Sequence, residues 1–202
     1  MNRSALVICV ALSTLVGGCV STKVETSGVA SSTTLCQSPG QGLSAMVLWG
    51  PIWRPNQKDV PLREEAARQG LEAFLASSGC FAKFHVKRLP GGGSAVVPAD
   101  QELLSLASTM NPRPDRVVVI TVRELGPIVK LFNSLALVEG GTEVVLGLIV
   151  IDANTGASLA HIQTHWQNGG ALVIKGVSSL PQDMNAALRA ALLSSDQHHE
   201  GG

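Results

Sequence analysis

Residues 116–125, with the sequence RVVVITVREL, constrain the fold of this chain more than any other segment. The run is apolar at four consecutive positions, Val117 to Ile120, so both faces of an extended strand need cover there. A strand of this kind lies in the interior of a sheet that is packed on both sides. The segment therefore predicts a layered domain with this strand near the centre of its sheet.

Four other segments have strand patterns. Residues 43–49 form a short apolar run, and residues 81–89 alternate as a less buried strand does. Residues 142–152 and 158–167 predict a hairpin, because the sequence Asp-Ala-Asn-Thr-Gly that links them is typical of a turn. With residues 116–125, these segments predict a sheet of about five strands.

Three amphipathic helices are expected, over residues 61–78, 100–110 and 182–193, where apolar side chains recur at helical spacing. The resulting element order is β-α-β-α-β-β-β-α. Together the patterns predict an α/β fold, a sandwich of one mixed sheet with helices packed against it. This single domain is expected over residues 43–193, followed by a polar tail at 194–202.

The N-terminal residues have the pattern of a secretory signal peptide. Arg3 is the only charge ahead of an apolar run from Ala5 to Val16, which is too short to span a membrane as a finished helix. An ordinary secreted protein that is cleaved near Gly18 would have this pattern too.

The sequence Val-Gly-Gly-Cys at residues 16–19 resembles the lipobox of bacterial lipoproteins. The resemblance implies that residues 1–18 are a lipoprotein signal peptide and that Cys19 carries the lipid. Two or more acyl chains, such as palmitate, anchor a protein stably in a membrane. Val20 stands where lipoproteins kept in the inner membrane carry Asp, so the resemblance implies the outer membrane and a domain facing the periplasm. The Ser/Thr/Gly-rich residues 19–42 are then expected to be a flexible tether.

Two further cysteines remain after the signal peptide and Cys19 are set aside. Cys36 and Cys80 each precede a predicted strand, and disulfides persist in an oxidising compartment such as the periplasm. A bridge between them would contribute about 4 kcal/mol by the chain-entropy model. Two separately buried thiols are the alternative.

The composition excludes some classes of partner. The 15 basic and 15 acidic residues balance, and no basic stripe runs along the chain, so a nucleic-acid binder is not expected. Aromatic residues make up only 3% and tyrosine is absent, which argues against a carbohydrate-stacking surface.

Catalytic and metal-binding patterns do not stand out. We find no nucleophile elbow and no cysteine with an evident base, so the chain is not expected to be an enzyme and no cofactor is implied. His161 and His165 lie four residues apart in a predicted strand, which separates them by about 13 Å and excludes one metal held by both.

Two segments are candidates for a partner-binding surface. Residues 126–139, GPIVKLFNSLALVE, are strongly apolar, and as a helix they would align Ile128, Leu131 and Phe132. The segment is either a helix or crossing that covers the sheet or an exposed patch. The second candidate is Trp53 with Arg54, because these residue types dominate interface energetics. An anchored protein needs no second membrane contact, so the apolar segment is expected to meet a protein.

The element order, the Asp-x-x-Thr-Gly turn at Asp152 and the closing helix together resemble periplasmic domains of the CsgG and TolB amino-terminal type. That resemblance implies a non-enzymatic accessory or scaffold in a cell-envelope assembly or secretion complex. Its partner would be an envelope protein or further copies of the chain in a homo-oligomer. The alternative is an auxiliary lipoprotein of an ABC-type lipid-trafficking system that binds an acyl chain.

Overall fold

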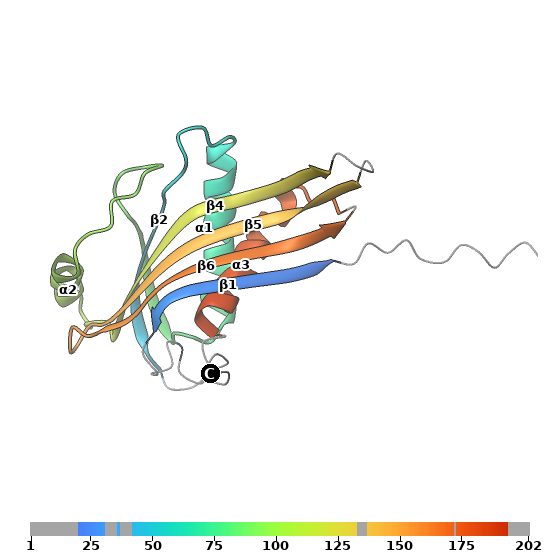
Figure 1. Ribbon diagram of the computed structural model, residues 1–202. Coiled ribbons are helices and arrows are strands. Elements are labelled where there is room, and N and C mark those ends of the chain that lie inside the picture. The colour runs from blue at the N-terminus through green and yellow to red at the C-terminus, as the bar shows by residue number, and fades with distance from the viewer. Residues whose placement is uncertain (1–19, 31–35, 37–41, 133–136, 172, 194–202) are drawn as a thin grey trace, which may run out of the picture.

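The strand predicted from residues 116–125 lies inside a six-stranded mixed sheet in the computed structural model (Figure 1). The structure describes residues 20–30, 36, 42–132, 137–171 and 173–193. For residues 130–132, 137 and 138 it describes the backbone alone. The strand order across the sheet is β1-β6-β5-β4-β2-β3. In chain order the elements are β1 (Ser21–Ala30), β2 (Ser44–Pro51), α1 (Val60–Ser77), β3 (Lys83–Arg88), α2 (Asp100–Ser108), β4 (Arg116–Phe132), β5 (Leu137–Asp152), β6 (Ser158–Ala171), the 3-10 turn η1 (Val177–Ser179) and α3 (Leu180–Leu193).

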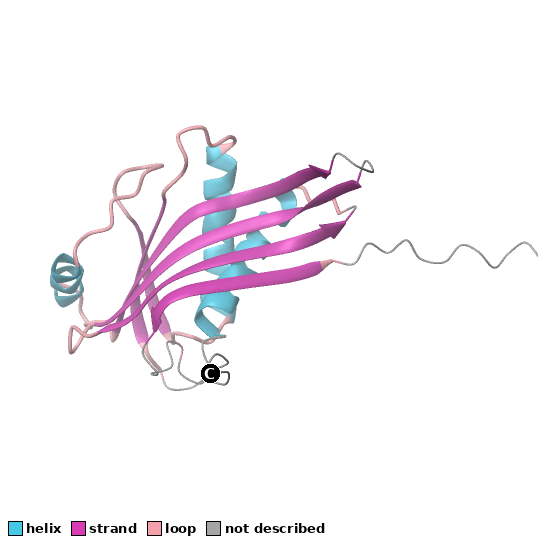
Figure 2. Ribbon diagram, viewed as in Figure 1, coloured by secondary structure: helices cyan, strands magenta, loops and turns pink. Residues whose placement is uncertain are grey.

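The predicted α/β fold is confirmed, with six strands in place of about five. From β2 onward the element order is the predicted β-α-β-α-β-β-β-α. Strand β2 pairs in parallel with β3 and β4, whereas β4, β5, β6 and β1 pair antiparallel in succession. Figure 2 shows α1 and α3 on one side of the sheet and α2 at one end.

Two apolar clusters fill the two faces. On one face α1 and α3 cover the sheet, and buried side chains such as Phe74, Leu146 and Met184 pack there. On the other face α2 covers part of β2 and β4, with Leu48, Leu103 and Val119 in contact. Because α2 is short, it leaves the rest of that second face uncovered. We call this uncovered area the open face.

The expectation that residues 19–42 are a flexible tether is wrong for Ser21–Ala30. These ten residues form β1, which pairs along its whole length with β6, from Ser21 opposite Gly169 to Ala30 opposite Ala160. All ten are exposed, so β1 has no alternating apolar pattern that a sequence could reveal. Backbone hydrogen bonds to β6 hold it in place.

Of the alternatives left open for residues 126–139, the helix is wrong. Strand β4 continues to Phe132 and β5 begins at Leu137, and these two residues face each other across the ladder. The four strands β4, β5, β6 and β1 extend together away from α2 (Figure 1). Where they end, Phe132 of β4 pairs with Leu137 of β5, and β1 begins. We call this end of the sheet the distal end.

Candidate binding cleft on the open face

A cleft of about 200 Å³ lies on the open face, over β4, β5 and β6. Gly147 of β5 forms its floor, because a glycine leaves a hollow between the side chains of the neighbouring strands. A Cβ atom at this position would lie 2.5 Å from Thr121 Oγ1. A side chain at position 147 would displace the Thr121 hydroxyl and fill the hollow.

The side chains around Gly147 come from two rows that cross the strands. In the first row Thr121, Gly147 and Gln163 face one another across β4, β5 and β6. In the adjacent row Val119, Ile149 and His161 do the same. Ile52 and Val97 form the remaining wall from outside the sheet. The first row is consequently polar, whereas the second row is apolar on β4 and β5 and ends in His161 on β6.

Arg123 completes the polar side through a β-bulge. The pairing of β4 with β5 shifts register between Val122 and Glu124, so Arg123 is the extra residue in β4. Bulges change the direction of a side chain and often lie next to functional sites. Arg123 is exposed, and it makes no hydrogen bond or ion pair to another described residue. Its guanidinium is thus available to a ligand.

The neighbouring carboxylate is already bound by two other arginines. Glu124 Oε2 lies 2.6 Å from Arg54 Nη2, and Glu124 Oε1 lies 2.9 Å from Arg63 Nη1. The Gln57 amide donates a further hydrogen bond to Glu124 Oε1. With its negative charge matched in this way, Glu124 is not available to neutralise Arg123.

The structure does not bring the five predicted partner-binding residues together. Trp53 is only 9% exposed and packs in the core, where its Nε1 donates to Glu64 Oε1, so the expectation that it faces a partner is wrong. Arg54 is exposed but paired with Glu124. Ile128 is half-buried in β4, and Leu131 and Phe132 follow it in the strand. Eight residues of strand, or about 26 Å, separate Glu124 from Phe132.

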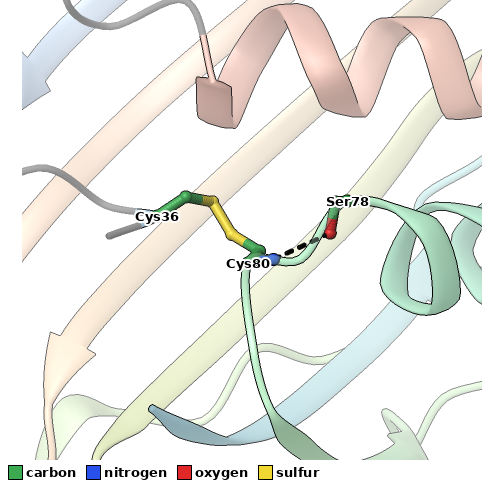
Figure 3. Close-up of a disulfide and its surroundings, with 3 residues drawn as sticks. All are labelled: Cys36, Ser78 and Cys80. Atoms are coloured by element: carbon green, nitrogen blue, oxygen red, sulfur yellow. Dashed lines mark hydrogen bonds between the residues drawn. A yellow bond between two sulfur atoms is a disulfide. The ribbon is translucent and has the colours of Figure 1, made fainter. Parts of the chain in front are cut away.

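The predicted disulfide is confirmed. Cys36 and Cys80 are bonded, with a Cα–Cα distance of 4.7 Å, and the Cys80 amide donates to Ser78 Oγ at 3.2 Å (Figure 3). The bridge ties the segment between β1 and β2 to the chain just after α1. The proposed lipidation site, Cys19, and the signal peptide at 1–18 lie outside the described residues, as does the tail at 194–202.

The two strand histidines lie on the open face with different neighbours. His161 lines the cleft, whereas His165 Nε2 lies 2.5 Å from Glu143 Oε1. In the described part of the chain, no three His, Cys, Asp or Glu side chains gather as metal ligands. No helix of the described residues is long and apolar enough to cross a membrane.

Sequence reasoning missed Arg123 and Gly147 as site residues. Gly147 stands inside the strong apolar run of β5, and a glycine in a strand interior often marks a close approach or a binding position. That signal was present. The bulge that directs Arg123 has no such signal, because it depends on the register between two strands.

Comparison with known proteins gives no family. No family model matches the chain, and no curated protein does. Among solved structures, the chain is similar to the PelC dodecamer from Paraburkholderia phytofirmans, with 16% identity and a TM-score of 0.43 over 85% of this chain and 98% of that one. It is also similar to lipoprotein GNA1162 from Neisseria meningitidis, with 16% identity and a TM-score of 0.40 over 75% and 99%.

Proposed function

We propose that this protein is a lipoprotein of the bacterial outer membrane, anchored through Cys19, that acts in the periplasm by binding and not by catalysis. The observation that carries the proposal is the position of β1. The strand begins at Ser21, two residues after the proposed lipid site, and is built into the sheet. Two residues span at most about 7 Å, so the lipid would hold the sheet itself close to the bilayer.

The anchor would also set which part of the domain faces the membrane. Ser21 pairs with Gly169, Gly169 with Gly141, and Gly141 with Ile128. Ser21 therefore lies three strand spacings, or about 14 Å, from Ile128 at the distal end of the sheet. The strand residues of the apolar segment, 126–132 and 137–139, pair at this same end.

We propose that this segment contacts the membrane, in place of the protein partner expected from the sequence. An apolar segment that lies about three strand spacings from the start of β1 is close enough to a lipid anchor at Cys19 to contact the lipid surface, where burial of its apolar side chains is favourable. The binding role then belongs to the parts of the domain that point away from the bilayer, the cleft among them. The scaffold role and the resemblance to CsgG- and TolB-type domains remain part of the proposal.

The test is lipid attachment in cells that express the full chain. Cys19→Ser should abolish incorporation of labelled palmitate and release the protein from the outer-membrane fraction. Cys9→Ser is the matched control, because Cys9 lies in the signal peptide and should leave labelling intact. Labelling of the Cys19→Ser variant, or release of the wild-type protein without detergent, would contradict the proposal.

A second experiment addresses the distal end. Replacing Leu131 and Phe132 by Ser in the Cys19→Ser background should lower sedimentation with outer-membrane lipid vesicles without lowering the melting temperature. A matched pair of substitutions on exposed α1 residues, Glu65→Ser and Gln69→Ser, should leave sedimentation unchanged. A drop in melting temperature would instead place the two apolar side chains in the core.

The acyl-chain carrier has less support. The cleft on the open face is smaller than the roughly 300–1,000 Å³ of pockets that enclose whole ligands, and part of its lining is polar. Lipid that co-purifies with the Cys19→Ser variant in stoichiometric amount would favour the carrier.

A homo-oligomer has one structural feature in its favour. Strand β1 is an edge strand with ten exposed residues, and an edge of this kind can pair with another chain. Light scattering of the detergent-solubilised protein would give the number of copies.

A further inference from the structure

We propose that the cleft over Gly147 binds a carboxylate carried on a small apolar group, which is the chemistry of a peptide's C-terminal residue. The proposal rests on the proposed binding role and names the chemistry of its ligand. It does not depend on the lipid anchor, so the two can fail separately.

Charge is the first argument for an anion. Arg123 reaches the cleft from the bulge and has no carboxylate partner among the described residues, while Glu124 is matched by Arg54 and Arg63. The ten residues that line the cleft include no Asp or Glu. A guanidinium binds a carboxylate through two parallel hydrogen bonds, and these are among the stronger contacts in proteins.

The neutral polar groups support the same ligand. Gln163 and His161 come from β6 and point to the same side of the sheet, one row apart, so both present polar groups to the cleft that Arg123 borders. Thr121 keeps the floor polar, and its hydroxyl already donates to the Gly147 carbonyl at 3.3 Å. These groups bind and orient an anion without supplying a nucleophile.

The apolar half selects against a free inorganic ion. Val119 and Ile149 lie beside the polar row, and Ile52 and Val97 face them from the wall. A strongly hydrated phosphate would lose water there without gaining contacts. An apolar side chain next to the carboxylate would bury surface against these four residues instead.

Size limits the ligand to the end of a longer molecule. About 200 Å³ is too little for a whole drug-sized ligand, but it accommodates one terminal residue. A carboxylate with a small apolar side chain on the same carbon is what a peptide presents at its C-terminus, and capture of that group is a known mode of recognition.

The test uses the detergent-solubilised full chain and the tripeptide acetyl-Gly-Gly-Leu in calorimetric titration. The free-carboxylate peptide should bind, and its C-terminal amide should bind at least about tenfold more weakly, because the amide loses the charged contact to Arg123. Arg123→Gln should weaken binding of the free-carboxylate peptide by a similar factor. Lys83→Gln, which removes the same charge from exposed β3, is the matched control. Its affinity for the free-carboxylate peptide should stay within about twofold of the wild-type affinity.

Gly147→Val tests the hollow separately from the charge. Its side chain should fill the cleft and abolish binding, while a preserved circular-dichroism spectrum would show that the sheet is intact. Equal binding of peptide and amide, wild-type affinity in Arg123→Gln, or equally tight binding of inorganic phosphate would each overturn the proposal. An absence of any peptide binding would overturn it too, while palmitate labelling at Cys19 would leave the proposed function standing.

Discussion

Arg116 Nη1 lies 2.6 Å from Asp152 Oδ2, and this ion pair joins the first residue of β4 to the last residue of β5. Both side chains are largely buried, at 9% and 19% exposure. Asp152 Oδ1 also accepts the amide hydrogens of Asn154 and Thr155, which close the turn between β5 and β6. One carboxylate therefore holds three strands in register at the end of the sheet opposite the distal end.

The stability that the Asp152 carboxylate contributes should depend on pH. Burial by itself raises the pKa of Asp152, but the amide hydrogen bonds and the Arg116 charge outweigh it and lower that pKa below its ordinary value. A lowered pKa contributes stability that is present above about pH 4 and lost as the pH falls through the folded-state value. We expect Asp152→Ala to lower the unfolding free energy by about 3 kcal/mol at pH 7, because it leaves Arg116 unpaired.

Urea unfolding at pH 7 and at pH 3 checks this prediction. The difference between wild type and Asp152→Ala should shrink at the lower pH. Asp115 would keep some acid sensitivity in the variant, because hydrogen bonds from the Ser44 amide and hydroxyl also lower its pKa. An equal difference at both pH values would contradict the role of the charge.

The disulfide should be a major source of stability. The bond between Cys36 and Cys80 closes a loop with a sequence separation of 44, which corresponds to about 4 kcal/mol in the chain-entropy model. Replacing both cysteines by Ser should lower the unfolding free energy by up to this amount. Wild type in reducing agent should match the double variant, and a remaining gap between them would mean that the serines act in some other way.

Gly70 should not tolerate a methyl group. A Cβ atom there would lie 2.5 Å from Met184 Cβ and 2.6 Å from the Pro181 carbonyl oxygen, where α1 packs on α3. Alanine gains about 1 kcal/mol in helix propensity, whereas overpacking costs about 1–3 kcal/mol. We expect Gly70→Ala to be destabilising by about 1 kcal/mol in urea titration. As a control at the exposed neighbouring position, Gln69→Ala should change the unfolding free energy by no more than about 0.5 kcal/mol.

Strand β1 should behave as part of the sheet in solution. Half of the amides of Ser21–Ala30 point toward β6, and hydrogen exchange should find those amides protected. Gly28 has φ of 120°, and a Cβ there would lie 2.2 Å from the His161 carbonyl oxygen. Gly28→Val should therefore remove the protection in β1 while α1 stays protected. Rapid exchange of all ten wild-type amides would mean that residues 21–30 are a flexible tether and not a strand.

Much of the fold could be predicted from local patterns. The strand at 116–125 and the hairpin around Asp152 were readable because buried side chains recur at period two or fill both faces. The helices were readable because Leu71, Phe74 and Leu75 recur at helical spacing. Strand β1 could not be predicted, because it buries no side chain and is specified by the free edge of β6.

The strand structure of residues 126–139 could not be predicted for a related reason. Short apolar runs are ambiguous between helix and strand, and only the β5 residues opposite decide which one forms. Trp53 was misplaced because it follows its strand in a loop that folds back over α1, where Glu64 accepts its indole hydrogen bond. Neither contact is local in the chain.

Residue types and spacings in the sequence predict the layered α/β fold, a bridge between Cys36 and Cys80, and a lipid anchor at Cys19. The tertiary structure decided the rest. It made a strand of the expected tether, placed Ser21 and the 126–139 hairpin at one end of the sheet, and gathered Arg123, His161 and Gln163 around Gly147. These relations depend on the register between strands that are distant in sequence, and a one-residue shift in register would move each side chain to the other face.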